Sequence, residues 1–141
     1  MTTDIDMASA EGANGVQIDE DLHSRQLAVY GKESMRRMAS SNVLIIGLGG
    51  LGVEVAKNVI LAGLKSVTLH DATPVEVRHL GSQFYLSEGD IGKPRAEACR
   101  DSLQELNTAV PVASSSEELS EAFLGQFDVW HGPRPTHART P

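Results

Sequence analysis

The chain has 141 residues, of which 40% are apolar, so it is long enough for one domain with a buried core and is neither a peptide nor a disulfide-stabilised miniprotein. Lys and Arg number 12 against 19 Asp and Glu, and the resulting net charge of −7 argues against nucleic acid as a partner. No apolar run approaches the roughly 20 residues of a membrane span and the first residues do not resemble a secretory signal, so we expect a soluble intracellular protein that makes no contact with membranes.

Charge divides the chain into three parts. Residues 1–21 contain six acidic side chains and no Lys or Arg, so we expect a disordered acidic tail over residues 1–18. Nearly all of the apolar periodicity falls in residues 19–130, which we expect to be the folded part. Residues 131–141 contain three of the six prolines and almost no apolar side chain, so they are expected to be a second disordered tail.

Two short helices are expected at the beginning of the folded part. Asp19 or Asp21 can cap a helix over residues 22–30, and Gly31 would end it. Residues 32–39 then predict a second helix.

The central strand and its partner are predicted next. Residues 43–46 are four consecutive apolar residues, as expected for a parallel strand that is buried on both faces. A glycine-rich turn follows, and residues 53–64 predict a helix. The helical stripe expected to be buried consists of Leu51, Val55, Val59 and Ala62. Residues 66–71 predict a second strand, which a right-handed crossover would place parallel to the first.

The remaining elements continue the alternation of helix and strand. After a loop over residues 72–90, we expect a helix over residues 95–107, a strand over residues 110–113, a helix between the serine run and Gly125, and the start of a fourth strand. This order predicts an α/β fold with a Rossmann-like, doubly wound parallel sheet. Such a sheet normally contains several more elements, so we expect this one to be incomplete, with an unstable open edge.

The glycine loop and the acid that ends the second strand form a candidate nucleotide site. In the run GLGGLG, Gly47 permits the tight turn out of the strand, Gly49 lets the backbone approach a pyrophosphate, and Gly52 permits close packing of the helix. Asp71 follows about 20 residues later, where a carboxylate can accept a hydrogen bond from a ribose hydroxyl. The same glycines can also serve the architecture alone, because a fold can keep the shape of a site after losing its ligand.

Residues that bind metals or act as nucleophiles are sparse. Cys99 is the only cysteine and the five histidines show no ligand spacing, so the sequence predicts no metal site and no internal disulfide. Cys99 lies in a predicted helix and is expected to be packed or idle. His70 could be a general base, but a histidine that ends a strand is more often a structural residue of the sheet.

Longer stretches of the sequence resemble a known family. The segments IDEDLHSRQLAVYGKESMRRM, SNVLIIGLGGLGVEVAKNVILAGLKSVTLHD and SQFYLSEGDIGKPRAEA are similar to the N-terminal region of eukaryotic ubiquitin-activating enzymes. The resemblance covers residues 18–130 and stops at the HGPRPTHARTP tail. It implies a partial fold of the ThiF/MoeB activating type over residues 19–130, in a fragment of a longer enzyme whose end looks truncated or frame-altered.

The resemblance also indicates which half of such an enzyme the chain represents. Family members pack an active and an inactive nucleotide-fold half into a pseudo-dimer, and the active half typically reads DxDxIxxSNLNRQF and IGxPKAE. Here Asp71 is kept, but Thr73 replaces the second acid and Arg95 replaces the lysine. The asparagines and the arginine of the first motif are replaced by His79, Gly81 and Ser82. We therefore expect the noncatalytic half, with a vestigial, empty nucleotide site at Gly47, Gly49, Gly52 and Asp71.

The same resemblance implies a cofactor, partners and one catalytic residue for the complete enzyme. The complete enzyme would use ATP and Mg, and this half would bind no cofactor. The fragment alone is expected to be inactive. The partners would be the active half and ubiquitin, in the cytoplasm and nucleus. In family members the SRQL helix brings an arginine to the ATP phosphates of the active half, so Arg25 is expected to act in trans. Without the resemblance, Arg25 could equally be a solvated or ion-paired surface residue.

Two other functions remain open from the sequence. The inactive subunit of a SUMO-type activating heterodimer has a similar helix and glycine loop. An NAD- or FAD-binding oxidoreductase domain would explain the glycine loop and Asp71, but not the GDIGKPRAEA segment.

Overall fold

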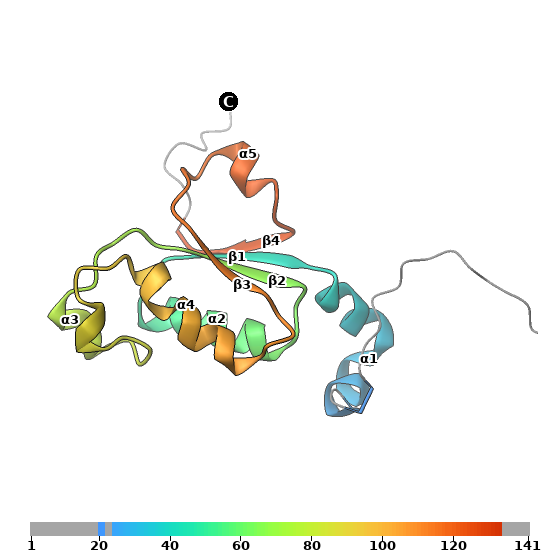
Figure 1. Cartoon of the computed structure of the whole chain (residues 1–141). Coiled ribbons are helices and arrows are strands. Elements are labelled where there is room, and N and C mark those ends of the chain that lie inside the picture. The colour runs from blue at the N-terminus through green and yellow to red at the C-terminus, as the bar shows by residue number, and fades with distance from the viewer. Residues whose placement is uncertain (1–19, 22–23, 134–141) are drawn as a thin grey trace, which may run out of the picture.

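The computed structural model describes residues 20–21 and 24–133 (Figure 1). The tail expected over residues 1–18 lies outside the described residues, as does most of the tail expected over residues 131–141. No helix in the described part of the chain is long and apolar enough to cross a membrane.

A four-stranded sheet forms the centre of the molecule (Figure 1). Its strands are β1 (Asn42–Ile46), β2 (Ser66–His70), β3 (Val112–Ser115) and β4 (Val129–His131). All neighbours are parallel, in the order β3-β2-β1-β4, so the chain moves outward from β1 in one direction and returns to its other side for β4. This arrangement confirms the predicted α/β fold with a doubly wound parallel sheet.

The two faces of the sheet are covered unequally. Helices α2 (Gly50–Leu61) and α4 (Arg95–Leu106) cover one face, and the other is covered by α5 (Glu121–Leu124) (Figure 1). The central strand supplies both cores because alternate side chains of a strand point to opposite faces. Val43 and Ile45 enter the core under α2 and α4, whereas Leu44 and Ile46 enter the core under α5.

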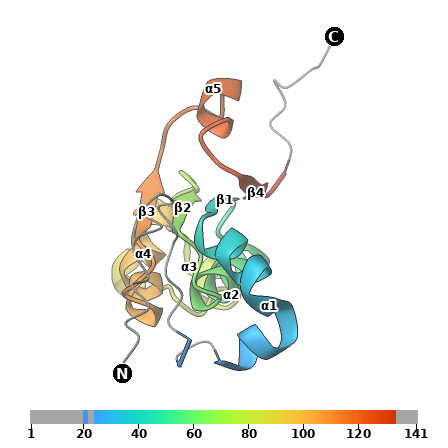
Figure 2. The ribbon, with the colours of Figure 1, turned by 90° about the vertical axis from the view of Figure 1, so that its right-hand side faces the viewer.

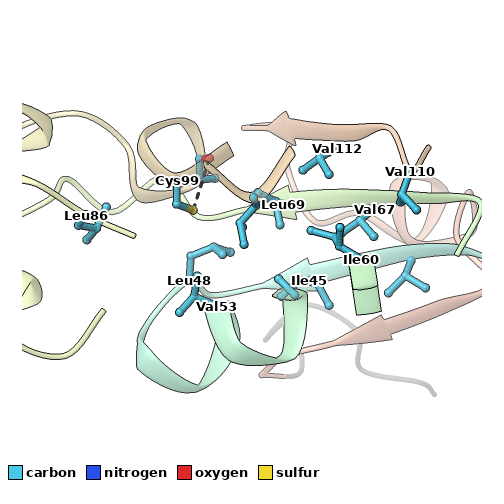
Figure 3. Packing of buried hydrophobic residues seen from close by; sticks show 14 of the residues in the cluster. Ile45, Leu48, Val53, Ile60, Val67, Leu69, Leu86, Cys99, Val110 and Val112 are labelled. Carbon is cyan, nitrogen blue, oxygen red and sulfur yellow. Dashed lines mark hydrogen bonds between the residues drawn. The ribbon is translucent and has the colours of Figure 1, made fainter. Parts of the chain in front are cut away.

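The larger core lies between the sheet and the two long helices (Figure 3). Leu69 of β2, Ile60 of α2 and Leu103 of α4 are fully buried there. Burying each such side chain stabilises the fold by about 1.5–3 kcal/mol. This core therefore fixes the positions of the carboxyl ends of β1 and β2 relative to each other.

Helix α2 buries the predicted stripe only in part. Leu51 is 73% exposed, while the side of the helix that carries Val53, Ala56 and Ile60 is buried. The helix begins at Gly50, inside the glycine loop, and its rotation is set where Gly52 packs against the preceding turn. The prediction was wrong for Leu51, because a count of apolar side chains could not include this backbone contact, whereas Val55 and Val59 are half-buried and pack against the larger core as predicted.

The predicted break between the first two helices is present in α1 (Ser24–Ala39). Gly31 has φ 77° and ψ 162°, which interrupts the helical conformation and separates a segment before it from a segment after it. Of the possible caps, Asp19 lies outside the described residues, and Asp21 is separated from the described part of the helix by residues 22–23, which the structure does not describe. In Figure 1, α1 lies beyond the amino ends of the strands, at the opposite end of the sheet from α3.

The segment expected as one loop contains local structure. It forms a short helix α3 (Val77–Leu80) and a 3₁₀ turn η1 (Glu88–Asp90), each with a reciprocal capping box. Ser120 caps α5, which is only four residues long, so most of the helix predicted after the serine run is absent. His131 belongs to β4, one residue beyond the boundary expected for the folded part.

Candidate functional site

The glycine loop joins β1 to α2 at the carboxyl edge of the sheet. Gly47 has φ 86°, a conformation that favours glycine, and its N–H donates to the carbonyl of His70 at 2.9 Å. A Cβ on Gly52 would lie 1.8 Å from the carbonyl oxygen of Gly47, and a Cβ on Gly50 would lie 2.6 Å from that of Ser82. The fold itself therefore requires small residues at these positions, with or without a ligand.

Asp71 is buried beside this loop, directly after β2, and is 7% exposed. Its Oδ2 accepts the N–H of Leu48 at 2.7 Å, and its Oδ1 accepts the N–H of Thr73 at 3.0 Å. The guanidinium of Arg95 donates to Oδ2 through Nε at 2.8 Å and Nη2 at 2.7 Å. The carboxylate is thus held by donors of the protein itself.

The charge state of Asp71 follows from these contacts. Burial alone would raise the pKa of the carboxyl group, but the hydrogen bonds from Leu48 and Thr73 and the positive charge of Arg95 together lower it below the usual value. Asp71 is therefore ionised at neutral pH, and Arg95 neutralises its charge.

Gln83 holds the glycine loop from its other side. This side chain is 2% exposed, and its Nε2 donates to the carbonyl of Leu48 at 2.7 Å. Its Oε1 is buried without a hydrogen-bond partner among the described residues. Both backbone groups of Leu48 are therefore bonded, to Asp71 and Gln83, which sequence reasoning did not predict. The available signal was that Gln83 and Phe84 match the last two residues of the active-half motif DxDxIxxSNLNRQF.

An open depression of about 500 Å³ lies beside the loop, at the carboxyl ends of β1 and β4. At this point of the sheet the chain leaves β1 toward β2 on one side and toward β4 on the other. Ligands of doubly wound folds usually bind at such a point. The lining of the depression includes three glycines of the loop and the residues Leu51, Trp130 and His131. None of the described residues that line it is Lys, Arg, Asp or Glu.

Arg25 lies at the other end of the molecule. It lines a depression of about 630 Å³ with Leu61 and Leu106, the last residues of α2 and α4. Helix α2 begins at the glycine loop and its 12 residues span about 17 Å, at 1.5 Å per residue. The structure therefore brings the loop glycines and Asp71 together and leaves Arg25 apart from them.

Cys99 and His70 have structural surroundings. Cys99 is fully buried, donates a weak hydrogen bond to the carbonyl of Ala96, and burial raises the pKa of its thiol to about 12 (Figure 3). Nε2 of His70 lies 2.7 Å from the carbonyl oxygen of Glu117, and the ring packs near that of Phe123. The described residues contain no group of His, Cys, Asp and Glu side chains suited to a metal ion.

Comparison with known proteins gives consistent matches. The model of the ThiF family matches residues 23–130. The chain is 58% identical over 125 residues to "Ubiquitin-activating enzyme E1 1" of Arabidopsis thaliana, covering 89% of this chain and 12% of that protein. It is 52% identical over 120 residues to the human "Ubiquitin-like modifier-activating enzyme 1", covering 85% and 11%. The chain thus spans little more than a tenth of the length of these relatives.

Solved structures show the same fold at low identity. The E. coli protein MccB, solved with MccA-N7isoASN, has a TM-score of 0.64 at 24% identity and covers 77% of this chain and 35% of its own. E. coli tRNA N6-threonylcarbamoyladenosine dehydratase, TcdA, solved with AMP, has a TM-score of 0.63 at 20% identity and covers 76% and 44%. The identities are low, so these two matches bear on the fold alone.

Proposed function

The chain belongs to the ThiF family, and from that premise we propose that it acts as the noncatalytic adenylation half of a ubiquitin-activating enzyme. In the complete enzyme, ATP would be used to adenylate the ubiquitin C-terminus, which then passes to a cysteine thioester. The role of this half would be to pack against the active half and to supply Arg25 to its ATP site. The observation that carries the proposal is the pairing of Asp71 with Arg95 beside a depression whose described lining contains no Lys or Arg.

Adenylation places a strong electrostatic demand on a site. Negative charge on a triphosphate develops further as the acyl-phosphate bond forms, so fixed cations and a metal ion are needed where that charge appears. In this chain Arg95, whose guanidinium lies next to Gly49 of the loop, is already neutralised by Asp71. The residues present therefore do not fit ATP and Mg, and we derive no adenylation step at this loop.

The residues that replace the active-half motif are used locally. Nδ1 of His79 accepts the N–H of Glu76 at 3.0 Å in the capping box of α3, and Gly81 ends that helix. The carbonyl of Ser82 lies against Gly50. These roles support a structural function for the segment in this half.

The position of Arg25 supports a role outside its own half. It lies on the first segment of α1, its side chain is exposed, and it is far from the glycine loop of this chain. An arginine held on one domain can stabilise negative charge in the site of another. The active half and ubiquitin are the proposed partners, in the cytoplasm and nucleus, with ATP and Mg bound by the active half.

The alternatives differ in the modifier and the chemistry. The inactive subunit of a SUMO-type heterodimer would pack on a separate chain and would not support the activation of ubiquitin. An oxidoreductase would bind NAD or FAD at the loop, where Asp71 is already paired.

A chimera tests the proposal. Residues 1–130 would replace the matching N-terminal region of the Arabidopsis thaliana relative, and ubiquitin-dependent exchange between ATP and pyrophosphate would be measured. We expect the chimera to be active and the 141-residue chain to be inactive alone. Exchange by the chain alone, or an inactive chimera that folds, would contradict the proposal.

Arg25 gives a sharper prediction in the same chimera. Arg25→Ala should lower the exchange rate about 100-fold or more, because a preorganised donor to developing charge is lost. Arg36→Ala is the matched control, since Arg36 is an exposed arginine on the second segment of the same helix. Equal rates for the two variants would remove the catalytic role of Arg25.

A further inference from the structure

We infer that Arg95 is the residue that excludes a nucleoside from the glycine loop, because its guanidinium fills the space between Asp71 and Gly49 that a ribose and a pyrophosphate would need. The inference rests on the proposed function, in which this half does not use ATP. It adds a specific reason why this half would not bind ATP, namely that one side chain of the protein occupies the position of the ligand.

The contacts of Asp71 support this cause. Oδ2 already accepts three hydrogen bonds, one from Leu48 and two from Arg95, and Oδ1 accepts one from Thr73. Two carboxylate oxygens offer about four lone-pair sites in all. A ribose hydroxyl could therefore reach Oδ2 only by displacing Arg95, while Oδ1 accepts the one bond from Thr73.

The surroundings of Gly49 show how far the obstruction extends. A Cβ built on Gly49 would have one neighbouring atom within 4 Å, Nη1 of Arg95, at 3.9 Å. Apart from the neighbours of Gly49 in the chain, no described backbone atom therefore comes within 4 Å of this position, and one side chain lies next to it. Removing that side chain should clear the route from Asp71 to the loop.

The backbone of Arg95 is held by the fold, so its side chain stays between Asp71 and the glycine loop. Its N–H donates to the carbonyl of Thr73 at 3.0 Å, and the next N–H, of Ala96, donates to the carbonyl of Asp71 at 3.2 Å. The first turn of α4 is thus attached to the segment after β2, and the side chain of Arg95 is only 18% exposed. Without Arg95, Asp71 would keep two backbone donors and gain free acceptor positions for a diol.

Adenosine is the suitable probe, because it carries a ribose and no phosphate, and the loss of a positive charge in Arg95→Ala does not weaken its binding. Titrations of the 141-residue chain would be followed by NMR chemical shifts of the loop amides. We expect the wild-type chain to show no saturable shift up to the highest adenosine concentration used, and Arg95→Ala to saturate with a dissociation constant at least tenfold below that concentration. Arg95→Ala combined with Asp71→Asn should lose the gain.

Two further variants make the result decisive. Lys93→Ala is the matched control, since Lys93 is a neighbouring cation that pairs with Asp90 and is 59% exposed; it should behave as the wild type. If Arg95→Ala does not fold, Arg95→Gln keeps part of the side chain and should give a smaller gain. A folded Arg95 variant without any gain would overturn the inference and leave the proposed function intact. Exchange of ATP and pyrophosphate by the wild-type chain alone would overturn the proposed function instead.

Discussion

The two faces of the sheet differ in how much structure covers them. The face under α2 and α4 contains 15 buried residues in one core, whereas the face under α5 contains three, Leu44, Ile46 and Phe123. The candidate site belongs to the first face, because the glycine loop, Asp71 and Arg95 are all attached to α2 or α4 or to the strand between them. The geometry of the loop therefore depends on the better-packed side of the domain.

The largest effect should come from the better-packed face. Ile60→Ala should lower the free energy of unfolding by about 3 kcal/mol, because a fully buried side chain is replaced by a cavity. Leu61→Ala is the control on the next residue of α2, where the side chain is 47% exposed, and it should cost less than about 1 kcal/mol. Urea unfolding followed by circular dichroism measures both values, and similar losses would show that the two positions are not distinguished by this core.

A smaller effect is expected on the other face. Phe123→Ala should cost about 2 kcal/mol, below the usual range for a buried phenylalanine, because α5 is short and neighbours only a small core. The neighbouring rings of Phe127 and His70 can also relax toward the space. The same urea measurement applies, and a loss larger than that of Ile60→Ala would reverse the ranking of the two faces.

The smallest effect concerns acid sensitivity at the site. The pKa of Asp71 is lower in the folded chain than in the unfolded one, so its ionised form stabilises the fold above the unfolded pKa, and that contribution is lost as pH falls through the folded pKa. Asp71→Asn should therefore lose about 1 kcal/mol at pH 7 and show a weaker decrease in stability toward acid. Asp101→Asn, at an 82% exposed carboxylate, should follow the wild-type pH profile; if Asp71→Asn follows it too, Asp71 does not contribute.

Part of this difference between faces could be read from the sequence. The buried strand β1, the glycine turn and the strand β2 were predicted, because a run of apolar residues is typical of a buried strand and clustered glycines are typical of a tight turn. The length of α5 was not predicted, since a serine cap and the apolar residues Leu119 and Phe123 fit a long helix as well as a single turn.

The site was predictable in its parts and not in its contacts. The residues of the glycine loop and Asp71 were identified by spacing alone. The pairing of Asp71 with Arg95 joins positions 24 residues apart, and it depends on where α4 begins relative to the end of β2. The rotation of α2 likewise depends on Gly52 approaching a carbonyl, a contact that side-chain periodicity does not report.

The break in α1 has a consequence for Arg25. Gly31 combines a positive φ with an extended ψ, a region of backbone conformation that is essentially restricted to glycine. The segment before it carries Arg25, and the segment after it leads directly into β1. The orientation of the helical segment that carries Arg25 therefore depends on the two torsion angles of Gly31. A residue with a side chain at this position would change that orientation.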